Sequence, residues 1–359
     1  MQNRIYGLDT YRAILLLAGP LIHSAPAVAA ELHLGTDLYG GMIRASGLFR
    51  MPVFFFIAGF LAAHAQGKQI GWIRRRLTQL CVPLLSTWLL LVLPLQYFKI
   101  GVFKEGGYNP VHLWFLMDLA LFSWIFSRPI ILAAVDKLCA RLGASNLLIG
   151  FFVVSGMLSA LRYPIAHIPV DVWTSNLLQS PAVAIYYLGG MVVQKHADLF
   201  QLIRRKPVAL GGLLLFLIAF PVIESLQGYL LPQQHRFLKL VIAGTSGVVA
   251  AGMCCAVMAS AIAMHWRPQF LSRLSRASYS IYLLHLPVIG IAAPLLVSSS
   301  ISVTANFAML SAISFGASWL LHEGLIQRSA ALHFLFNGVA PRPASAPMQT
   351  STRANIPTS

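Results

Sequence analysis

Ten apolar segments, each about 20 residues long, decide what this chain can fold into. Wound into a helix, such a segment crosses the hydrocarbon core of a bilayer and satisfies its own backbone hydrogen bonds. Hydrophobic residues make up 57% of the sequence and charged residues only 10%, which excludes an ordinary soluble domain. The sequence therefore predicts an all-α, polytopic membrane helical bundle of about ten transmembrane helices. Their expected ranges are 8–28, 46–65, 78–98, 111–130, 145–162, 178–195, 207–225, 238–263, 277–298 and 302–325.

These segments are expected to form one transmembrane domain, 1–338, followed by a disordered cytoplasmic tail, 339–359. The tail is rich in Pro, Ala, Ser and Thr and offers little apolar surface to bury. Lys and Arg concentrate in the segments on the same side as the N-terminus, as in the run Arg74–Arg76. Because cytoplasmic loops carry such an excess, both termini are expected in the cytoplasm. The net charge of +16 then faces cytosol and anionic headgroups, and it predicts no nucleic-acid partner.

The first segment carries two polar residues, Arg12 and His23, within an otherwise apolar run. They are about three helical turns apart, so both side chains lie on one helix face, roughly 16 Å apart along the axis. Ionisable residues within a span usually face a bundle interior or a water-filled cavity. Gly19-Pro20 lies between them and favours a kink near His23. The pattern predicts a polar track along this helix.

Structural alternatives remain for both residues. Asp9 lies three residues before Arg12, and the pair could simply anchor the helix at the cytoplasmic edge. His23 could be a packed histidine that takes no part in chemistry. The charged start, the apolar run and the segment Ala25–Ala30 also resemble a cleavable signal peptide, whose removal would discard both residues.

Asp118 is expected at about the same depth as His23, roughly 10 Å below the outer surface. A buried carboxylate is costly unless it is paired. We expect Asp118 to hydrogen-bond His23, directly or through water, and to fix its tautomer, as a carboxylate does for a general base. The alternative is that Asp118 pairs with a polar group of another helix and serves packing only.

Further ionisable residues border the expected spans. Arg50 lies at the outer entrance of the second span, His285 lies near the middle of the ninth, and Glu323 lies at the inner end of the tenth. The run Arg74–Arg76 lies at the inner entrance of the third span. Guanidinium groups bind phosphates bidentately, so the run predicts a phosphate site. Three arginines before a span are also ordinary topology anchors.

No other motif points to a cofactor. The four cysteines form no CxxC pair, which predicts neither a metal site nor a disulfide framework. The polar path leaves two classes open: a transferase that takes a phosphate-bearing acyl donor from the cytosol, or a transporter for an anion or a sugar. Transporters often show repeated halves, and this sequence shows no repeat, which favours the enzyme. A purely structural scaffold needs no ionisable residues at mid-depth.

Several motifs together resemble the membrane acyltransferase 3 family, and they span residues 8–338. The nearest branch is that of the osmoregulated periplasmic glucan C proteins, which are glucan succinyltransferases. The motifs are Leu8-Asp-x-x-Arg12 with His23, Phe49-Arg-Met-x-Val-Phe-Phe, His112-Leu-Trp-Phe-Leu116, Ser278-Tyr-Ser-Ile-Tyr-Leu-Leu-His285 and Glu323-x-Leu-Ile-x-Arg-Ser.

The resemblance implies transfer of an acyl group from cytosolic acyl-CoA to a hydroxyl of a glycan beyond the membrane. It also implies that Arg12 and His23 are functional. The expected co-substrate is succinyl-CoA or acetyl-CoA, with no bound cofactor and no metal. The expected partners are the lipid bilayer and a glycan acceptor, and the expected location is the bacterial inner membrane.

In the mechanism that we expect, the CoA phosphates bind Arg74, Arg75 and Arg76, and Arg12 meets the pyrophosphate or the thioester. His23 then deprotonates an acceptor hydroxyl, or alternatively forms an acyl-histidine intermediate. Asp118 supports His23 as the second catalytic residue. The acceptor and supporting residues are expected to be Arg50, His112, Trp114, His285 and Glu323.

Two departures from the family pattern leave alternatives open. Many members carry two arginines spaced three apart before the third span, whereas here Arg76 is followed by Gln79. Asp118 lies outside the family motifs. The alternatives to a glucan succinyltransferase are an exopolysaccharide O-acetyltransferase and a transporter of glycans or anions.

Overall fold

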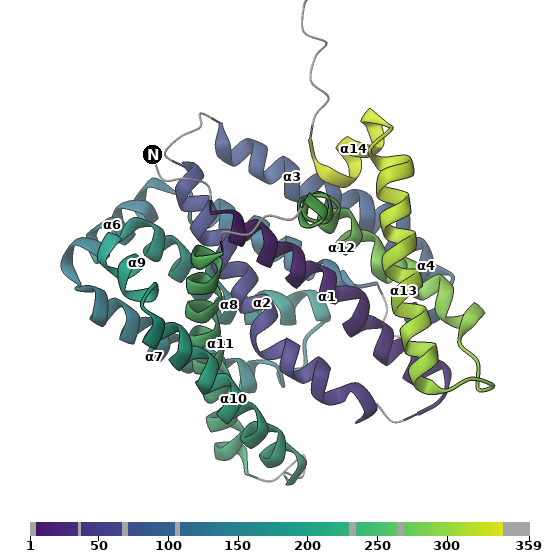
Figure 1. Cartoon of the computed structure of the whole chain (residues 1–359), viewed down its shortest axis with the longest axis horizontal. Helices are drawn as coiled ribbons and strands as arrows, with labels where there is room; N and C mark the ends of the chain where they lie inside the picture. Colours follow the sequence, from purple (N-terminus) through teal and green to yellow (C-terminus); the bar gives the residue numbers. More distant parts are fainter. Residues whose placement is uncertain are drawn as a thin grey trace, which may run out of the picture.

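The computed structural model describes residues 5–34, 37–66, 71–104, 108–229, 235–264 and 269–339, and in these ranges every regular element is helical (Figure 1). The predicted tail therefore lies outside the described residues, apart from its first residue. The helices are α1 Tyr6–Glu31, α2 Asp37–Gln66, α3 Trp72–Thr87, the π-helix η1 Trp88–Val92, α4 Leu93–Tyr97, the 3-10 helices η2 Gly101–Phe103 and η3 Val111–Leu113, α5 Trp114–Ile125, α6 Pro129–Arg141, α7 Ala144–Ile165, α8 Val172–Lys195, α9 Ala197–Ile203, α10 Lys206–Tyr229, α11 Arg236–Ala263, α12 Gln269–Leu296, α13 Val303–Leu321, the π-helix η4 His322–Ile326 and α14 Ala330–Asn337.

The expected membrane bundle is confirmed, with fewer clear spans than the ten predicted. Within the described ranges, eight helical stretches are long and apolar enough to cross a bilayer, or nine if the bent pair of α5 and α6 counts as one span. The remaining expected span, 178–195, is helical as part of α8, but it is not among these candidates. Polar residues such as Gln179 and Gln194 lower the mean hydropathy of this helix. They are tolerated because α8 packs against α2 and much of it does not face lipid.

The fourth expected span is not a straight helix. α5 has only 12 residues, about 18 Å of helix, and α6 leaves it at an angle of 80°. Arg128 between them is extended, with ψ of 133°, and Pro129 opens α6. A residue before proline is pushed out of the helical region, and proline is favoured at the first position of a helix. The chain therefore turns sharply at Arg128-Pro129.

α2 and α8 approach each other closely through glycines. A Cβ added at Gly190 would collide with the carbonyl oxygen of Phe56, and one added at Gly59 would collide with the carbonyl oxygen of Tyr187. Small residues allow such contact between membrane helices, where packing replaces the hydrophobic effect as the driving force. The two glycines therefore hold together the helices that carry one side of the functional region.

Gly190→Ala is expected to destabilise the fold, because the added methyl group forces α2 and α8 apart. Overpacking costs about 1–3 kcal/mol, and a backbone obstacle cannot rotate away. Gly150→Ala is the matched control, since nothing lies within 4 Å of a Cβ at that helical position. Thermal unfolding in detergent checks both variants. A midpoint for Gly190→Ala equal to that of the control would contradict the close approach.

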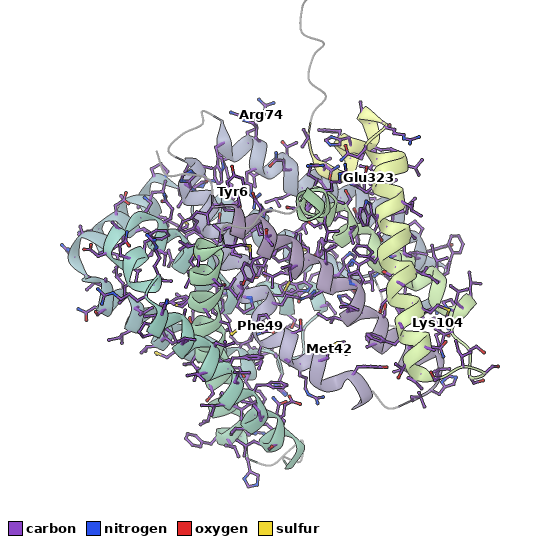
Figure 2. All side chains as sticks on the ribbon, in the orientation of Figure 1. Tyr6, Met42, Phe49, Arg74, Lys104 and Glu323 are labelled. Atoms are coloured by element: carbon purple, nitrogen blue, oxygen red, sulfur yellow. The ribbon has the colours of Figure 1, made fainter. Side chains whose placement is uncertain are left out.

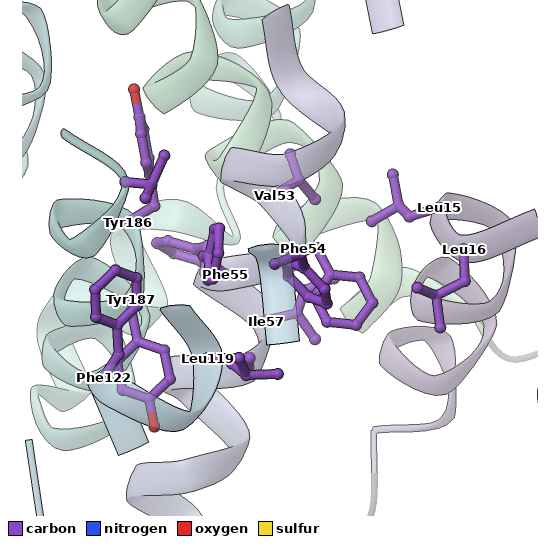
Figure 3. Packing of buried hydrophobic residues seen from close by; sticks show 14 of the residues in the cluster. Leu15, Leu16, Val53, Phe54, Phe55, Ile57, Leu119, Phe122, Tyr186 and Tyr187 are labelled. Carbon is purple, nitrogen blue, oxygen red and sulfur yellow. The ribbon is translucent and has the colours of Figure 1, made fainter. Parts of the chain in front are cut away.

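An aromatic-rich core joins four helices (Figure 3). Leu15 and Leu16 of α1 face Phe54 of α2, while Phe122 of α5 lies against Tyr187 of α8. Phe55 is fully buried between these groups, with ring centroids 4.9 Å from Phe115 and 5.3 Å from Phe122. Tilted and edge-on aromatic pairs of this kind add to the energy of burial. They fix α2 relative to α5 and so position the residues that follow on both helices.

The two ends of the bundle differ in the residues that they carry. Tyr6, Arg74 and Glu323 lie toward one end, and Met42 and Lys104 lie toward the other (Figure 2). The side of the N-terminus therefore also holds the arginine run, as the distribution of basic residues predicts. We refer to this end as the inner side and to the opposite end as the outer side.

Candidate active site

A cavity of about 370 Å³ lies toward the outer side, between α1, α2, α5, α8 and α12. We call it the outer cavity. Five of the residues singled out in the sequence line it, although they come from five separate elements. The lining residues are His23, Arg50, Met51, Asn109, Val111, His112, Trp114, Val172, Asn176, Tyr282 and His285.

Three histidines form a contiguous group in this cavity. The His285 ring contacts the other two, with ring centroids 5.2 Å from His23 and 5.0 Å from His112. His285 Nδ1 lies 2.6 Å from the carbonyl oxygen of Tyr282, so this nitrogen carries a proton. Nε2 is then the acceptor nitrogen, and it is buried with no hydrogen-bond partner in the described residues. A Cβ at Gly19 would lie 3.0 Å from Nε2, so the glycine leaves room for the ring.

His112 is also held by the backbone of α12. Its Nε2 donates to the carbonyl oxygen of Leu283 at 3.3 Å, and the Tyr282 hydroxyl donates to the carbonyl oxygen of His112. His112 Nδ1 is buried and unpaired in the part of the chain that is described. His23 differs from both rings, because it is only half-buried and forms no hydrogen bond with any described residue. It is therefore the imidazole that is free to act on a bound molecule.

Arg50 brings a positive charge to the same cavity. It lies close enough to His23 and Tyr282 to interact electrostatically. Among the described residues, no carboxylate lies within ion-pair distance of its guanidinium. An unpaired guanidinium shielded from bulk water is costly, and it is well suited to bind an anion or an oxygen that gains negative charge.

A second cavity, of about 460 Å³, lies toward the inner side, and we call it the inner cavity. Its polar lining comes from Arg12, Arg75, Arg76, Gln79, Tyr279 and Asn337. Arg12 forms an ion pair of 3.7 Å with Asp9 and also lines the cavity, so the anchoring role and the cavity role are compatible. The lining contains no carboxylate, which leaves the inner cavity strongly cationic.

Aromatic side chains of the two cavities are in contact with one another. Phe115 lines the inner cavity and Tyr282 lines the outer one, and their ring centroids are 5.8 Å apart. Phe54 packs edge-on against Phe115 at 4.6 Å. No residue lines both cavities. Two cavities with different lining residues therefore lie along α1, and we call the aromatic contacts between them the aromatic partition.

Among the described residues, Asp118 forms no direct hydrogen bond with His23, and its partner lies on another helix. Asp118 accepts a hydrogen bond of 2.5 Å from the Ser180 hydroxyl of α8 and interacts electrostatically with Arg162. It lines neither cavity. It lies in α5, about one helical turn after Trp114, and its carboxylate meets α8. Similar expected depth in the bilayer therefore did not imply a contact between Asp118 and His23.

Two other predicted residues lie outside both cavities. Arg74 is exposed and points outward (Figure 2). Arg75 and Arg76, in contrast, line the inner cavity. Residues two positions apart in a helix are rotated by about 200° around its axis, so Arg74 and Arg76 cannot share a face. Glu323 is exposed on η4, while its neighbour His322 is buried. Glu323 therefore stands at the surface and does not reach the functional region.

Some lining residues had only a weak signal in the sequence, or none. Tyr282 lies three residues before His285, so helical spacing alone places both on one face. Asn109 and Asn176 come from segments without a motif, and only the folded chain brings them to the outer cavity. In the described residues, no group of three His, Cys, Asp or Glu is arranged to hold a metal ion.

A family model described as an acyltransferase domain, acyltransferase 3, matches residues 5–323. The chain belongs to the acyltransferase 3 family. No curated protein and no solved structure matches the chain. The matched range contains the whole outer cavity and every lining residue of the inner cavity except Asn337. Membership in the acyltransferase 3 family, together with the apolar helices, supports a multi-pass membrane O-acyltransferase.

Proposed function

We propose that the chain moves an acyl group from cytosolic acyl-CoA to a hydroxyl of a glycan on the outer side of the membrane. The observation that carries this proposal is the position of His23, which has no hydrogen bond to the described chain and shares a cavity with the unpaired Arg50. A cationic cavity lies about 16 Å away along the same helix, at Arg12. Acyl transfer across a membrane needs a basic group at the site of reaction and a cationic site that binds the phosphates of the donor.

The inner cavity suits the donor. Arg75, Arg76 and Arg12 bind the phosphates of CoA, because guanidinium forks match phosphate oxygens. The pantetheine arm is narrow and flexible, and it reaches toward the outer cavity between Phe115 and Tyr282. These aromatic rings must move apart for the thioester to pass. When no donor is bound, their contact keeps the two sides of the membrane separated.

The outer cavity suits the reaction itself. His23 accepts the proton of the acceptor hydroxyl as the oxygen attacks the thioester carbonyl, and a C–O bond forms. Negative charge develops on the carbonyl oxygen of the tetrahedral intermediate, where Arg50 stabilises it. The intermediate then expels the CoA thiolate, which takes the proton from His23. In the acyl-histidine variant, His23 attacks the thioester first and ping-pong kinetics result.

His285 replaces Asp118 as the residue that orients His23. The His285 ring contacts the His23 ring, and its Nε2 carries no proton because Nδ1 donates to the carbonyl oxygen of Tyr282. A hydrogen bond from His23 to this nitrogen, direct or through one water, selects the His23 tautomer. His112, Trp114, Asn109 and Asn176 line the space that the acceptor occupies.

The acyl group is succinyl or acetyl, and the membrane is the bacterial inner membrane. The motifs shared with the osmoregulated periplasmic glucan C proteins favour succinyl, and an unpaired Arg50 can also pair with the free carboxylate of a succinyl group. An exopolysaccharide O-acetyltransferase would use the same two cavities. The aromatic partition favours an enzyme over a transporter, because a whole glycan needs a wider opening than a pantetheine arm.

Mass spectrometry of cell-envelope glycans tests the proposal. Bacterial cells that express the chain are expected to carry glycans with the added mass of a succinyl or an acetyl group, and deletion of the gene removes that mass. Proteoliposomes that take up a glycan or an anion without acyl-CoA, and that form no acylated product, would instead establish a transporter.

Asp118→Asn is expected to keep acyl transfer within about threefold of wild type. The asparagine oxygen still accepts from Ser180, and His23 does not depend on it. Asp118→Leu removes both this acceptor and the carboxylate that interacts with Arg162, and it is expected to lower stability by about 1–3 kcal/mol, although Ser180 can still donate to the carbonyl oxygen of Asn176. Turnover and thermal unfolding of both purified variants provide the check. A hundredfold loss of turnover in a normally stable Asp118→Asn variant would restore a catalytic role for this carboxylate.

A further inference from the structure

The last helix, α14, completes the inner cavity although it lies beyond the matched acyltransferase domain. The match ends at residue 323, and α14 covers Ala330–Asn337. α14 packs on α3, the helix that carries Arg75 and Arg76 (Figure 1). Asn337, its last residue, lines the inner cavity together with these arginines. The proposed donor site is therefore built partly from a segment beyond the matched range.

Two contacts hold α14 in place on α3. The Ser86 hydroxyl donates a hydrogen bond to the carbonyl oxygen of Leu335. Gly338 ends the helix with φ of 64°, in the left-handed region that favours glycine. A Cβ at Gly338 would collide with the backbone of Gln79. Contacts of the residues on both sides of Asn337, Leu335 and Gly338, thus fix its position against α3.

A chain of hydrogen bonds orients the Asn337 amide. Gln327 Nε2 can only donate, so at 2.9 Å it donates to His322 Nε2. His322 Nδ1 then carries the proton and donates to Ser280 Oγ at 2.8 Å. Ser280 in turn donates to Asn337 Oδ1 at 3.1 Å. The side-chain oxygen of Asn337 thus accepts a hydrogen bond, and its NH2 group is the last donor of this hydrogen-bond series.

The NH2 group of Asn337 has no hydrogen-bond partner among the described residues. Asn337 Nδ2 is shielded from water and unpaired among the described residues, and the same holds for Arg76 Nε. Both residues line the inner cavity, in which Arg12 and Arg75 add positive charge and no carboxylate is present. Unsatisfied buried donors are rare and call for a ligand that supplies acceptors. Donors without acceptors beside several guanidinium groups fit an anion with several oxygens.

We propose that the Asn337 amide donates to a phosphate oxygen of the acyl donor, beside Arg76. This inference rests on the proposed function, because it assigns a new contact to the same donor site. Asn337 supplies a neutral donor of fixed direction, whereas the arginines supply charge. The Gln327–His322–Ser280 chain is the positioning device that keeps the NH2 group, and not the oxygen, available to the phosphate.

Isothermal titration of the purified full-length chain in phosphatidylcholine nanodiscs tests the proposal, with CoA and with pantetheine as probes. Asn337→Asp removes the donor and places a carboxylate beside the phosphate. It is expected to weaken CoA binding at least about tenfold, while binding of pantetheine, which has no phosphate, stays unchanged. Ala331→Asp adds the same charge at an exposed position of α14 and is expected to bind CoA within about twofold of wild type.

If Asn337→Asp does not give a monodisperse protein, Asn337→Ala and Ser280→Ala serve in its place. Each is expected to weaken CoA binding by about threefold or more, the first by removing the donor and the second by freeing the amide to turn. Equal CoA affinity in wild type and in all folded variants would overturn the inference alone. A wild-type chain that binds no CoA would overturn the proposed donor as well.

A second source of phosphate is the headgroup of an anionic lipid, and the same variants separate the two. Nanodiscs that contain phosphatidylglycerol are expected to leave the wild-type affinity for CoA within about threefold. If Asn337→Asp released bound phosphatidylglycerol but left CoA binding intact, the site would belong to a lipid and the proposal would be wrong.

Discussion

His23→Ala is expected to lower acyl transfer by about 10³-fold or more, with CoA binding unchanged. Removal of a general base costs about 10²–10⁴-fold, and removal of a nucleophile stops the acyl-histidine route altogether. The imidazole lines the outer cavity and lies about 16 Å from Arg12 along α1, so the donor phosphates do not contact it. Single-turnover transfer from radiolabelled acyl-CoA, measured beside CoA titration, separates the two effects.

His167→Ala is the matched control for this variant. His167 is exposed after the end of α7, where its Nδ1 contacts the carbonyl oxygen of Tyr163, and it lines neither cavity. Its loss is expected to leave transfer unchanged. Transfer at the wild-type rate by a folded His23→Ala protein would remove the chemistry that we assign to the outer cavity.

Arg50→Gln is expected to lower kcat by about 10²–10³-fold, because the tetrahedral intermediate loses its stabilising charge in a site shielded from water. The Michaelis constant for acetyl-CoA is expected to change little, since the phosphates bind in the other cavity. Arg50→Lys keeps a positive charge without the guanidinium fork, so it should recover part of the rate. Steady-state kinetics with a soluble glycan acceptor provide the measurement.

Arg44→Gln gives a control on the same helix. Arg44 lies on α2 and pairs with Glu224 at 2.6 Å, and it lines neither cavity. Turnover in this variant is expected to stay near the wild-type value. Equal losses in the two variants would mean that Arg50 acts on folding and not on the reaction.

The two proposed acyl groups can be distinguished with the same Arg50 variant. If Arg50 pairs with the free carboxylate of a succinyl group, Arg50→Gln raises the Michaelis constant for succinyl-CoA and leaves that for acetyl-CoA unchanged. If Arg50 acts only on the intermediate, kcat falls equally with both donors. The ratio of the two effects identifies the natural donor.

The sequence was informative where one helix carried the pattern. Arg12 and His23 lie on α1, and helical periodicity placed them at successive depths, where each now lines a cavity. The positions of the apolar segments were equally visible, because the bilayer sets their length. Local features of this kind depend on spacing within one segment and can be read without knowledge of the tertiary fold.

The sequence failed where the answer depended on rotation or on a partner helix. Depth alone suggested that Asp118 meets His23, but the rotation of α5 turns Asp118 toward Ser180 of α8. In the aromatic partition, Phe115 of α5 contacts Tyr282 of α12, and the sequence of neither helix indicates that the two residues meet. Asn337 reaches the inner cavity only because Gly338 lets α14 close against α3. Such pairings arise from tertiary packing.

The central claim is that donor and acceptor react across the membrane through two cavities of one chain, and its most direct test is sidedness. Sealed proteoliposomes receive radiolabelled acyl-CoA on the side where Arg74 is exposed and a soluble glycan only on the other side. We expect acylated glycan to form in the compartment that never contained acyl-CoA, and to be absent with His23→Ala. Acylation only when donor and glycan share one compartment would contradict the claim.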